Sequence, residues 1–285
     1  PCLTRPRLVQ YRLPLIWGSD AGLCMSPDGG RTVLRWVLND RAGAPLEAGT
    51  RANFTGAELV YWSDVDRAIC VRKRNSPAEW HALGKALSLG DSVKDIAATS
   101  RDILLTVVSA EGSPYVIALD RGTAEVARRP DLASAKSVPG GAVIVVRSSG
   151  GVVSEWRNQK ALAMAFEKGS GADWACDPER RVGAAIERGK LVLAQDALRA
   201  ELSATCGFYS RVWALPERRA FLVCRQGAFG RADVFAIGYD GTNRGCYASV
   251  EEPVSSPVCQ AVPGLVALLR SLDQARPTEQ RQPAR

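Results

Sequence analysis

The stretch 94-KDIAATSRDILLTVVSAEGSPYVIALDRGTAEVAR-128 contains four short runs of strand-forming residues separated by polar turns. The two central runs, Asp102–Ser109 and Tyr115–Asp120, are rich in Val, Ile and Leu. The flanking runs, Lys94–Thr99 and Thr123–Arg128, are more polar. Gly, Pro and Ser occupy the breaks between runs, as they do in tight turns. We therefore predict a unit of four short strands joined by turns.

The same unit recurs along the chain. Apolar runs follow a polar turn at six anchor positions, 34 to 40 residues apart: Arg31, Arg67, Arg101, Gly141, Arg181 and Arg219. Two units also match in sequence, Trp174–Arg181 (WACDPERR) and Trp213–Arg219 (WALPERR). Runs such as Val143–Val146 are continuously apolar, which is typical of strands covered on both faces. Helical periodicity is nearly absent before residue 260.

About six four-stranded units at this spacing are the signature of a β-propeller. The spacing also fits a β-sandwich array or a ring of seven blades. We predict an all-β fold with a single propeller over residues 1–262, closed by pairing of the N- and C-terminal strands. Residues 263–285 are expected to be separate from it. Pro263–Leu272 is predicted as a short helix, and the polar segment Gln274–Arg285 as a mobile tail.

The segment Ser26-Pro27-Asp28-Gly29-Gly30-Arg31-Thr32 fits the pattern S-x-D-x-G-x-T and resembles the Asp box of sialidase-like propellers. The resemblance implies a structural hairpin remote from the active site. Ser26 opens the box, Asp28 bonds the turn backbone, Gly30 takes a positive φ, and Thr32 begins the next strand. The aromatic residue that usually follows is Val33 here.

A second local likeness suggests a ligand. Tyr11-Arg12-Leu13-Pro14 resembles the Y/F-R-I-P motif of sialidases, in which the Arg is one of three that grip a carboxylate. This resemblance implies a glycan-binding protein or a glycoside hydrolase with Arg12 as a ligand-binding residue. Only 11 residues separate the motif from the Asp box, where a sialidase has most of a blade. An edge strand with a surface Arg is the competing interpretation.

Tyr61-Trp62-Ser63-Asp64 resembles the Y-W-T-D repeat of six-bladed receptor propellers. The motif occurs once, so we interpret it as a blade strand with a packed aromatic residue. Blade packing also accounts for the other Trp residues in strand-like runs, Trp17, Trp174 and Trp213.

Eight cysteines are spaced widely along the chain, with no C-x-x-C pair among them. An even number at such spacing predicts up to four disulfides in an oxidising compartment, and hence a periplasmic or secreted protein. The candidate pairs are Cys2–Cys259, Cys176–Cys206 and Cys224–Cys246, with Cys24 and Cys70 as the remaining candidates. The alternatives are buried thiols in a cytoplasmic core and, for Cys2, a lipid anchor.

Catalytic and metal-binding motifs are scarce. His81 is the single histidine, and no G-x-S-x-G segment presents a nucleophilic Ser to it. We expect His81 to be a surface or half-buried residue beside Trp80. Asp64 and Asp66 lack EF-hand spacing, as does the pair Glu251-Glu252. The sequence therefore predicts neither a catalytic residue, a metal site nor a cofactor.

Charge and hydropathy argue against a nucleic-acid-binding protein and against a membrane-spanning helix. The net charge is +7, from 37 Lys and Arg against 30 Asp and Glu, but the cations are spread along the chain. No basic block or nucleic-acid motif is present, and no stretch approaches ~18 uncharged apolar residues. We predict a non-enzymatic, extracytoplasmic propeller that serves as a protein-binding or scaffold subunit of an envelope or secreted assembly. The glycan-acting protein that uses Arg12 is the alternative.

Overall fold

The structure is a computed structural model. It describes residues 15–19, 22–26, 32–36, 38–46, 51–54, 58–73, 76–138, 144–148, 150–165, 173–195, 198–202, 208–226, 232–250, 256–258 and 278–281. For the strands within residues 15–36, 256–258 and 278–281, only the backbone pairing is considered.

The described residues form six antiparallel sheets, here called blades 1 to 6. Blade 1 contains β24 (Ser256–Val258), β1 (Leu15–Ser19), β2 (Gly22–Ser26), β3 (Thr32–Trp36) and β25 (Thr278–Arg281). Blade 2 contains β4 (Ala52–Phe54), β5 (Glu58–Ser63), β6 (Ala68–Lys73) and β7 (Glu79–Ala82). Blade 3 contains β8 (Ser92–Ala98), β9 (Asp102–Val108), β10 (Pro114–Asp120) and β11 (Val126–Arg129).

The second half of the chain repeats this arrangement. Blade 4 contains β12 (Leu132–Ser137), β13 (Ile144–Ser148), β14 (Val152–Glu155) and β15 (Ala161–Ala165). Blade 5 contains β16 (Trp174–Asp177), β17 (Val182–Glu187), β18 (Lys190–Gln195) and β19 (Leu198–Leu202). Blade 6 contains β20 (Phe208–Leu215), β21 (Ala220–Gln226), β22 (Ala232–Gly238) and β23 (Asn243–Val250). Short 3₁₀ turns occupy Gly84–Ala86 and Pro216–Arg218.

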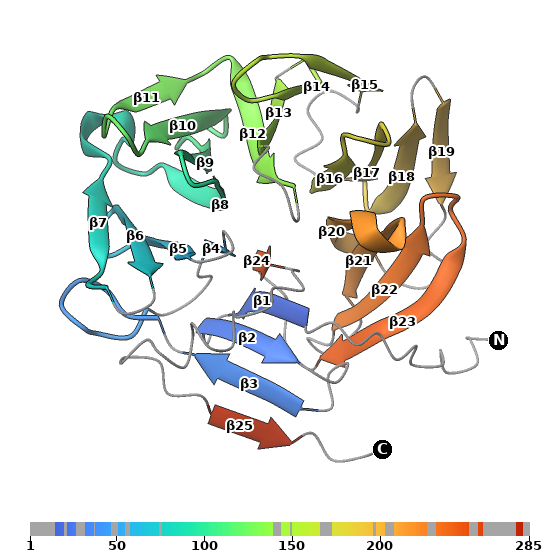
Figure 1. Cartoon of the computed structure of the whole chain (residues 1–285), viewed down its shortest axis with the longest axis horizontal. Helices are drawn as coiled ribbons and strands as arrows, with labels where there is room; N and C mark the ends of the chain where they lie inside the picture. Colours follow the sequence, from blue (N-terminus) through green and yellow to red (C-terminus); the bar gives the residue numbers. More distant parts are fainter. Residues whose placement is uncertain are drawn as a thin grey trace.

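The blades are arranged radially around a central axis (Figure 1). Each blade has an inner strand A, two middle strands B and C, and a strand D outside them, and blade 1 has β25 as a fifth strand at its outer edge. The inner strands meet around the axis, where β24 contacts β4, β4 contacts β8, β8 contacts β12, and β16 contacts β20. The C-terminal strand β24 pairs with the N-terminal strand β1. The predicted propeller, and its closure by the two ends of the chain, are therefore confirmed.

The hydrophobic core lies between neighbouring blades. Separate clusters join blades 2 and 3, 3 and 4, 4 and 5, and 5 and 6. Strands β9 and β10 are buried along almost their whole length, because each is covered by a neighbouring blade on both faces. This is why their sequences are continuously apolar rather than alternating. Trp62, Trp174 and Trp213 are all buried, as the sequence predicts.

Several tight turns between strands end in an arginine with a positive φ. Arg67, Arg181 and Arg219 have φ values of 48°, 52° and 47°. Arg181 and Arg219 end the two matching sequences and join strands A and B of blades 5 and 6. A left-handed non-glycine residue costs about 1–2 kcal/mol, and the turns offset part of this cost through hydrogen bonds. For example, the Arg219 amide donates to the Pro216 carbonyl at 3.1 Å.

The structure differs from the sequence prediction in the register of the repeat. The anchors at residues 101, 141, 181 and 219 precede B strands. Those at residues 31 and 67 precede β3 and β6, which are the D strand of blade 1 and the C strand of blade 2. A polar turn followed by an apolar run marks any buried strand, so the pattern does not identify which strand it is.

The predicted boundary at residue 263 is also corrected. Residues 278–281 form β25, which pairs with the outer edge of β3. Residues 278–281 therefore contribute a strand to blade 1, so this part of the predicted tail Gln274–Arg285 is paired. The predicted helix at residues 263–272 lies outside the described residues.

Two of the disulfide predictions are wrong. Cys176 carries a free, buried thiol, so the bridge between Cys176 and Cys206 is absent. Cys224 lies in β21 and Cys246 in β23, with β22 between them. Their backbones are therefore about 10 Å apart, beyond the ~7 Å limit for a disulfide. Cys2 and Cys259 lie outside the described residues, and of Cys24 only the strand position is described.

Candidate functional site

The antiparallel blades give the ring two distinct faces. The connections from strand B to C and from strand D to the next blade lie at one end, which we call the loop face. Four of its described loops, from blades 1 to 3, span residues 38–46, 64–67, 83–91 and 109–113. The A–B and C–D connections lie at the other end, which we call the hairpin face. The central channel between these faces is lined by the inner strands.

A lysine lies between two carboxylates in the channel. Lys136 of β12 forms ion pairs with Asp95 of β8 and with Asp173, where the Nζ–Oδ1 distance is 2.6 Å. Burial disfavours the charged ammonium, but the two carboxylates outweigh it and raise the pKa of Lys136. The other oxygen of Asp173 accepts a hydrogen bond of 2.8 Å from the Val212 amide in β20. Four consecutive blades, 3 to 6, are thereby linked at the axis.

A second group of polar contacts continues the network into blade 2. The Asn53 amide Nδ2 donates to the Ile96 carbonyl at 3.1 Å and to the Ser137 hydroxyl at 3.2 Å. Ser137 Oγ also accepts from the Ala98 amide at 3.0 Å. Asn53 Oδ1 is buried without a hydrogen-bond partner. A buried acceptor of this kind is usually satisfied by an ordered water.

A small cavity opens beside this network. It has a volume of about 40 Å³ and is lined by residues of blades 4 to 6, including Lys136, Cys176, Trp174 and Trp213. A volume of this size holds a few water molecules. Pockets for small organic ligands are typically about 300–1,000 Å³. The cavity beside Lys136 therefore has room for water molecules but not for an organic ligand of ordinary size.

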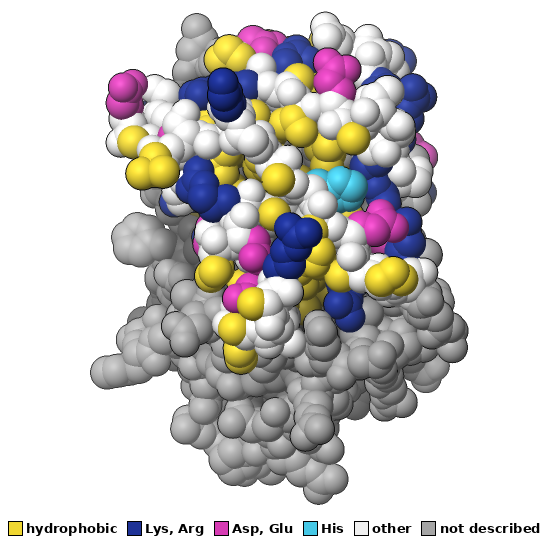
Figure 2. Space-filling model, turned by 90° about the vertical axis from the view of Figure 1, so that its left-hand side faces the viewer, with side chains coloured by type: hydrophobic (Ala, Val, Ile, Leu, Met, Phe, Trp, Pro, Cys, Tyr) yellow, Lys and Arg dark blue, Asp and Glu magenta, His cyan; other side chains and the backbone are white. Residues whose placement is uncertain are grey.

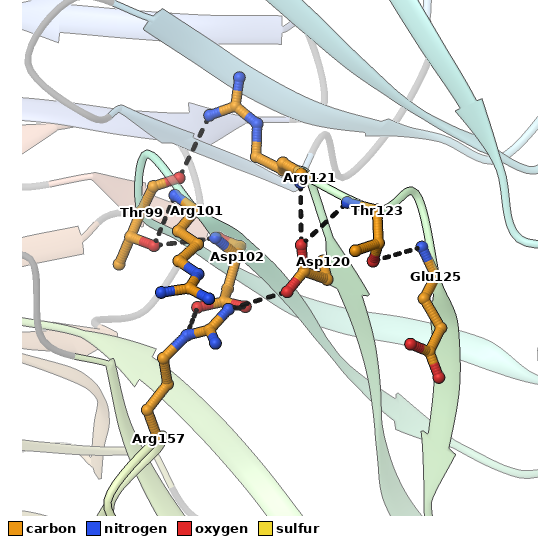
Figure 3. Close-up of polar contacts among 9 residues, drawn as sticks. Thr99, Arg101, Asp102, Asp120, Arg121, Thr123, Glu125 and Arg157 are labelled. Carbon is orange, nitrogen blue, oxygen red and sulfur yellow. Dashed lines mark hydrogen bonds and ion pairs between the residues drawn. The ribbon is translucent and has the colours of Figure 1, made fainter.

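On the hairpin face, charged residues connect neighbouring blades. Arg121, just after β10 of blade 3, forms two hydrogen bonds of 2.6 and 3.0 Å with Glu58 of blade 2. Arg157 of blade 4 makes a bidentate contact with Asp102 of blade 3 at 2.6 and 2.8 Å and a third bond to Asp120 at 3.0 Å (Figure 3). In both cases, a carboxylate beside the A–B turn of one blade binds the C–D turn of the next.

Blades 5 and 6 use the same geometry with different side chains. The Tyr239 hydroxyl, in the C–D turn of blade 6, donates to Asp177 at 3.0 Å. Asp177 lies at the A–B turn of blade 5 and is 1% exposed. The recurrence at three blade junctions indicates a structural role, because each contact fixes one blade against the next.

The pair Glu58–Arg121 predicts a pH dependence of stability. Burial alone raises the pKa of Glu58, but the hydrogen bonds and charge of Arg121, with Lys73, hold that pKa below its ordinary value of 4.5. The pair therefore contributes stability above pH ~4.3, the pKa of an unfolded Glu, and loses it as the pH falls through the lower folded value. We expect the stability difference between the wild type and Arg121→Leu to be constant from pH 6 to 7 and to shrink below pH ~4. Urea unfolding at several pH values measures it, and a difference unchanged at pH 3.5 would contradict the assignment.

On the loop face, hydrogen bonds join consecutive loops. The Arg41 amide donates to Asp66 at 2.9 Å. The Arg67 guanidinium donates to the carbonyls of Leu87 and Ser88 at 3.2 and 2.7 Å. The Ala110 amide donates to Asp91 at 3.2 Å. These contacts link the four described loops, from blades 1 to 3, into one continuous surface.

The four loops carry charges of both signs and a net charge of −2, from three basic residues (Arg41, Arg67 and Lys85) and five acidic ones (Asp40, Asp64, Asp66, Asp91 and Glu111). Their exposed ionisable residues are Arg41, Asp64, Lys85 and Glu111. The side of the molecule in Figure 2 likewise shows small hydrophobic areas between Lys, Arg, Asp and Glu side chains, with no area of one sign. An extended anionic polymer requires a basic stripe, which the visible surface of the described residues does not show.

The candidate site residues predicted from the sequence do not come together in one place within the described residues. Arg12, Asp28 and Gly30 lie outside the described residues. Ser26 ends β2 and Thr32 begins β3, so the Asp box connects two paired strands. His81 is half-buried in β7 with no hydrogen-bond partner at Nε2, and burial lowers its pKa. Within the described residues, no cluster of three His, Cys, Asp or Glu side chains is arranged to hold a metal ion.

Sequence reasoning missed the channel network and the contacts between blades. Lys136 and Asp95 are 41 residues apart, and Glu58 and Arg121 are 63 apart. One signal was available, because Lys136 is the one lysine within an otherwise small and apolar inner strand, LASAKS. The described residues contain no helix with the length and hydrophobicity needed to cross a bilayer.

Comparison with known proteins identifies the fold. No family model and no curated protein matches the sequence. A solved nidogen/laminin complex has a TM-score of 0.55 at 8% identity, over 86% of this chain and 96% of that chain. TolB from Acinetobacter baumannii has a TM-score of 0.54 at 15% identity, over 87% of this chain and 66% of that chain. Virginiamycin B lyase from Staphylococcus aureus has a TM-score of 0.52 at 8% identity, over 75% and 73%.

At these identities, the likeness shows the fold alone. The similar structures are β-propellers, and this chain spans about two thirds of the TolB chain. Their printed names include a lyase and a member of a protein complex, so the fold is used for both kinds of function. Together with the six radial sheets, the likeness shows that the chain is a β-propeller.

Proposed function

We propose that the chain is a non-catalytic propeller that acts outside the cytoplasm as a protein-binding or scaffold subunit of a larger assembly. The observation that carries this proposal is the loop face. Four loops from three blades are cross-linked there by hydrogen bonds into one surface with charges of both signs. Such a surface is pre-organised, which reduces the entropy lost when a partner binds.

The contacts between inner strands at the axis support the same proposal. Lys136, Asp95 and Asp173 tie inner strands together, and the adjoining cavity of about 40 Å³ is too small for an organic ligand. The broad outer surface of the ring is then the larger area for recognition. A protein interface of standard size needs about 800 Å² from each partner.

Crosslinking of the tagged full-length protein inside cells, followed by affinity purification and mass spectrometry, tests partner binding. We expect one protein to co-purify in near-stoichiometric amount. If no protein exceeded the background of a tag-only control, or if the purified chain turned over a substrate at an ordinary enzyme rate, the proposal would fail.

A thiol count tests the compartment. Burial raises the pKa of Cys70 to about 11 and also raises that of Cys176, so both thiols are unreactive in the folded protein. After denaturation without reductant, an extracytoplasmic protein should show fewer than eight reactive thiols. Cys70 and Cys176 should be among those that react, since both are free in the structure. Eight reactive thiols in protein isolated without reductant from its native cells would place it in a reducing compartment instead.

A further inference from the structure

Two hydrophobic side chains protrude from neighbouring turns of the loop face. Val65 is 73% exposed and Leu89 is 92% exposed. Their turns, residues 64–67 and 88–91, adjoin one another, because Arg67 of the first donates to the carbonyl of Ser88 in the second at 2.7 Å. Isolated exposed hydrophobics are common on protein surfaces, so exposure alone carries little weight. What distinguishes these two residues is how firmly their turns are held.

The turn that carries Leu89 is fixed from several sides. Asp91 accepts hydrogen bonds from the Ser88 amide at 2.9 Å, from the Ala110 amide at 3.2 Å and from the Tyr115 hydroxyl at 2.5 Å. The Arg128 guanidinium stacks on the Tyr115 ring at 4.0 Å. Gly90 has a φ of 88°, which a residue with a Cβ rarely adopts. Leu89 is thus held at a fixed tip while making almost no contact within the chain.

The turn that carries Val65 is fixed in a similar way. The Trp62 indole donates to Asp64 at 2.6 Å, and the Ser63 hydroxyl donates to Asp66 at 2.7 Å. The Asp66 amide donates back to Ser63 Oγ at 3.1 Å. Asp66 also accepts the Arg41 amide of the adjacent loop at 2.9 Å. Val65 is therefore a second apolar tip on a pre-organised turn.

We infer that Val65 and Leu89 are the anchor residues of the loop face and insert into a concave apolar site on the partner protein. The inference rests on the proposed function. Rigid apolar anchors bind with little loss of conformational entropy, which is why they dominate many interfaces. The most exposed charges around them, Arg41, Asp64, Lys85 and Glu111, sum to zero, and the half-buried Asp40, Asp66, Asp91 and Arg67 bring the net charge of the four loops to −2. A rim of mixed charge with a small excess of carboxylates suits a protein surface better than an anionic bilayer, which attracts clustered Lys and Arg.

The chain provides a matched control. Leu198 is 77% exposed, between Val65 and Leu89 in exposure, but it begins β19 after the C–D turn of blade 5. It therefore lies toward the hairpin face. A photoreactive benzophenone amino acid replaces the residue at position 65, 89 or 198 of the full chain. Cells that produce each variant are then irradiated to form crosslinks. Mass spectrometry of the purified adducts then identifies what each position touches.

We expect positions 65 and 89 to crosslink to the same protein and position 198 not to do so. With that protein purified, Val65→Asp and Leu89→Asp should each weaken its affinity for the full chain at least about tenfold. Leu198→Asp should change it less than twofold. Because all three side chains are exposed, the thermal midpoints of the variants should match that of the wild type.

Three results would overturn the inference. The first is equal crosslinking at position 198, and the second is an affinity unchanged by Leu89→Asp. Either would leave the proposed function standing with a different binding surface. The third is binding to vesicles of phosphatidylcholine and phosphatidylglycerol that Leu89→Asp abolishes, which would assign the tips to a membrane. Failure of the proposed function is distinct, since no protein would then co-purify at all.

Discussion

Replacing Lys136 by Met is expected to lower the free energy of unfolding by about 3 kcal/mol, the low end of the range for breaking a buried ion pair. The substitution leaves the carboxylates of Asp95 and Asp173 facing each other without their shared cation. Loss of the cation affects Asp173 more than Asp95, because the Asp173 side chain is only 3% exposed. The loss should appear as a lower urea midpoint, measured by Trp fluorescence.

Two controls separate charge from packing. Lys136→Arg keeps a cation between the carboxylates and should recover most of the stability. Lys160→Met removes an exposed lysine in the C–D turn of the same blade and should change stability by less than about 0.5 kcal/mol. If Lys136→Met were no more destabilising than Lys160→Met, the channel network would not hold the inner strands together.

Removing the contact between Arg121 of blade 3 and Glu58 of blade 2 should lower the free energy of unfolding by a similar amount. Arg121 and Glu58 have side chains that are 10% and 13% exposed, so Arg121→Leu leaves a largely buried carboxylate without its bidentate partner. We expect a loss of about 3 kcal/mol in the free energy of unfolding. Glu58→Gln should also destabilise, and the double variant should lose at least about 1 kcal/mol less than the sum of the single variants.

An exposed ion pair serves as the comparison for this double-mutant cycle of Arg121 and Glu58. Lys190 and Glu201 form an ion pair with side chains 54% and 50% exposed. Its removal by Lys190→Met should cost at most about 1 kcal/mol. Additive effects of Arg121→Leu and Glu58→Gln would show that the two side chains do not act as a pair, contrary to the geometry.

The repeat was visible in the sequence because each blade buries its middle strands on both faces. In blade 3, the four predicted strands agree with β8 to β11 to within three residues at each end. In blades 1 and 2, the anchor positions did not mark the B strand, because a polar turn and an apolar run also precede C and D strands. Arg67 shows this directly, since its left-handed turn lies between β5 and β6 on the loop face.

The polar contacts could not be predicted from the sequence, because they depend on how neighbouring blades are aligned. Asp95 reaches Lys136 from a strand with a register shift between Val93 and Asp95, which no local pattern reveals. The predicted pair Cys224–Cys246 failed for the same reason. Sequence spacing placed Cys224 near Cys246, but the antiparallel order of the sheet puts a whole strand between them.

The central claim is that a protein partner binds the loop face, and lysine-specific crosslinking in cells tests it most directly. Lys85 lies in the loop 83–91 of the loop face, and Lys160 lies in the C–D turn of blade 4 on the hairpin face. Both side chains are exposed, so both react with the reagent. Our account predicts crosslinks to the partner from Lys85 and none from Lys160. Crosslinks from Lys160 without any from Lys85 would contradict it.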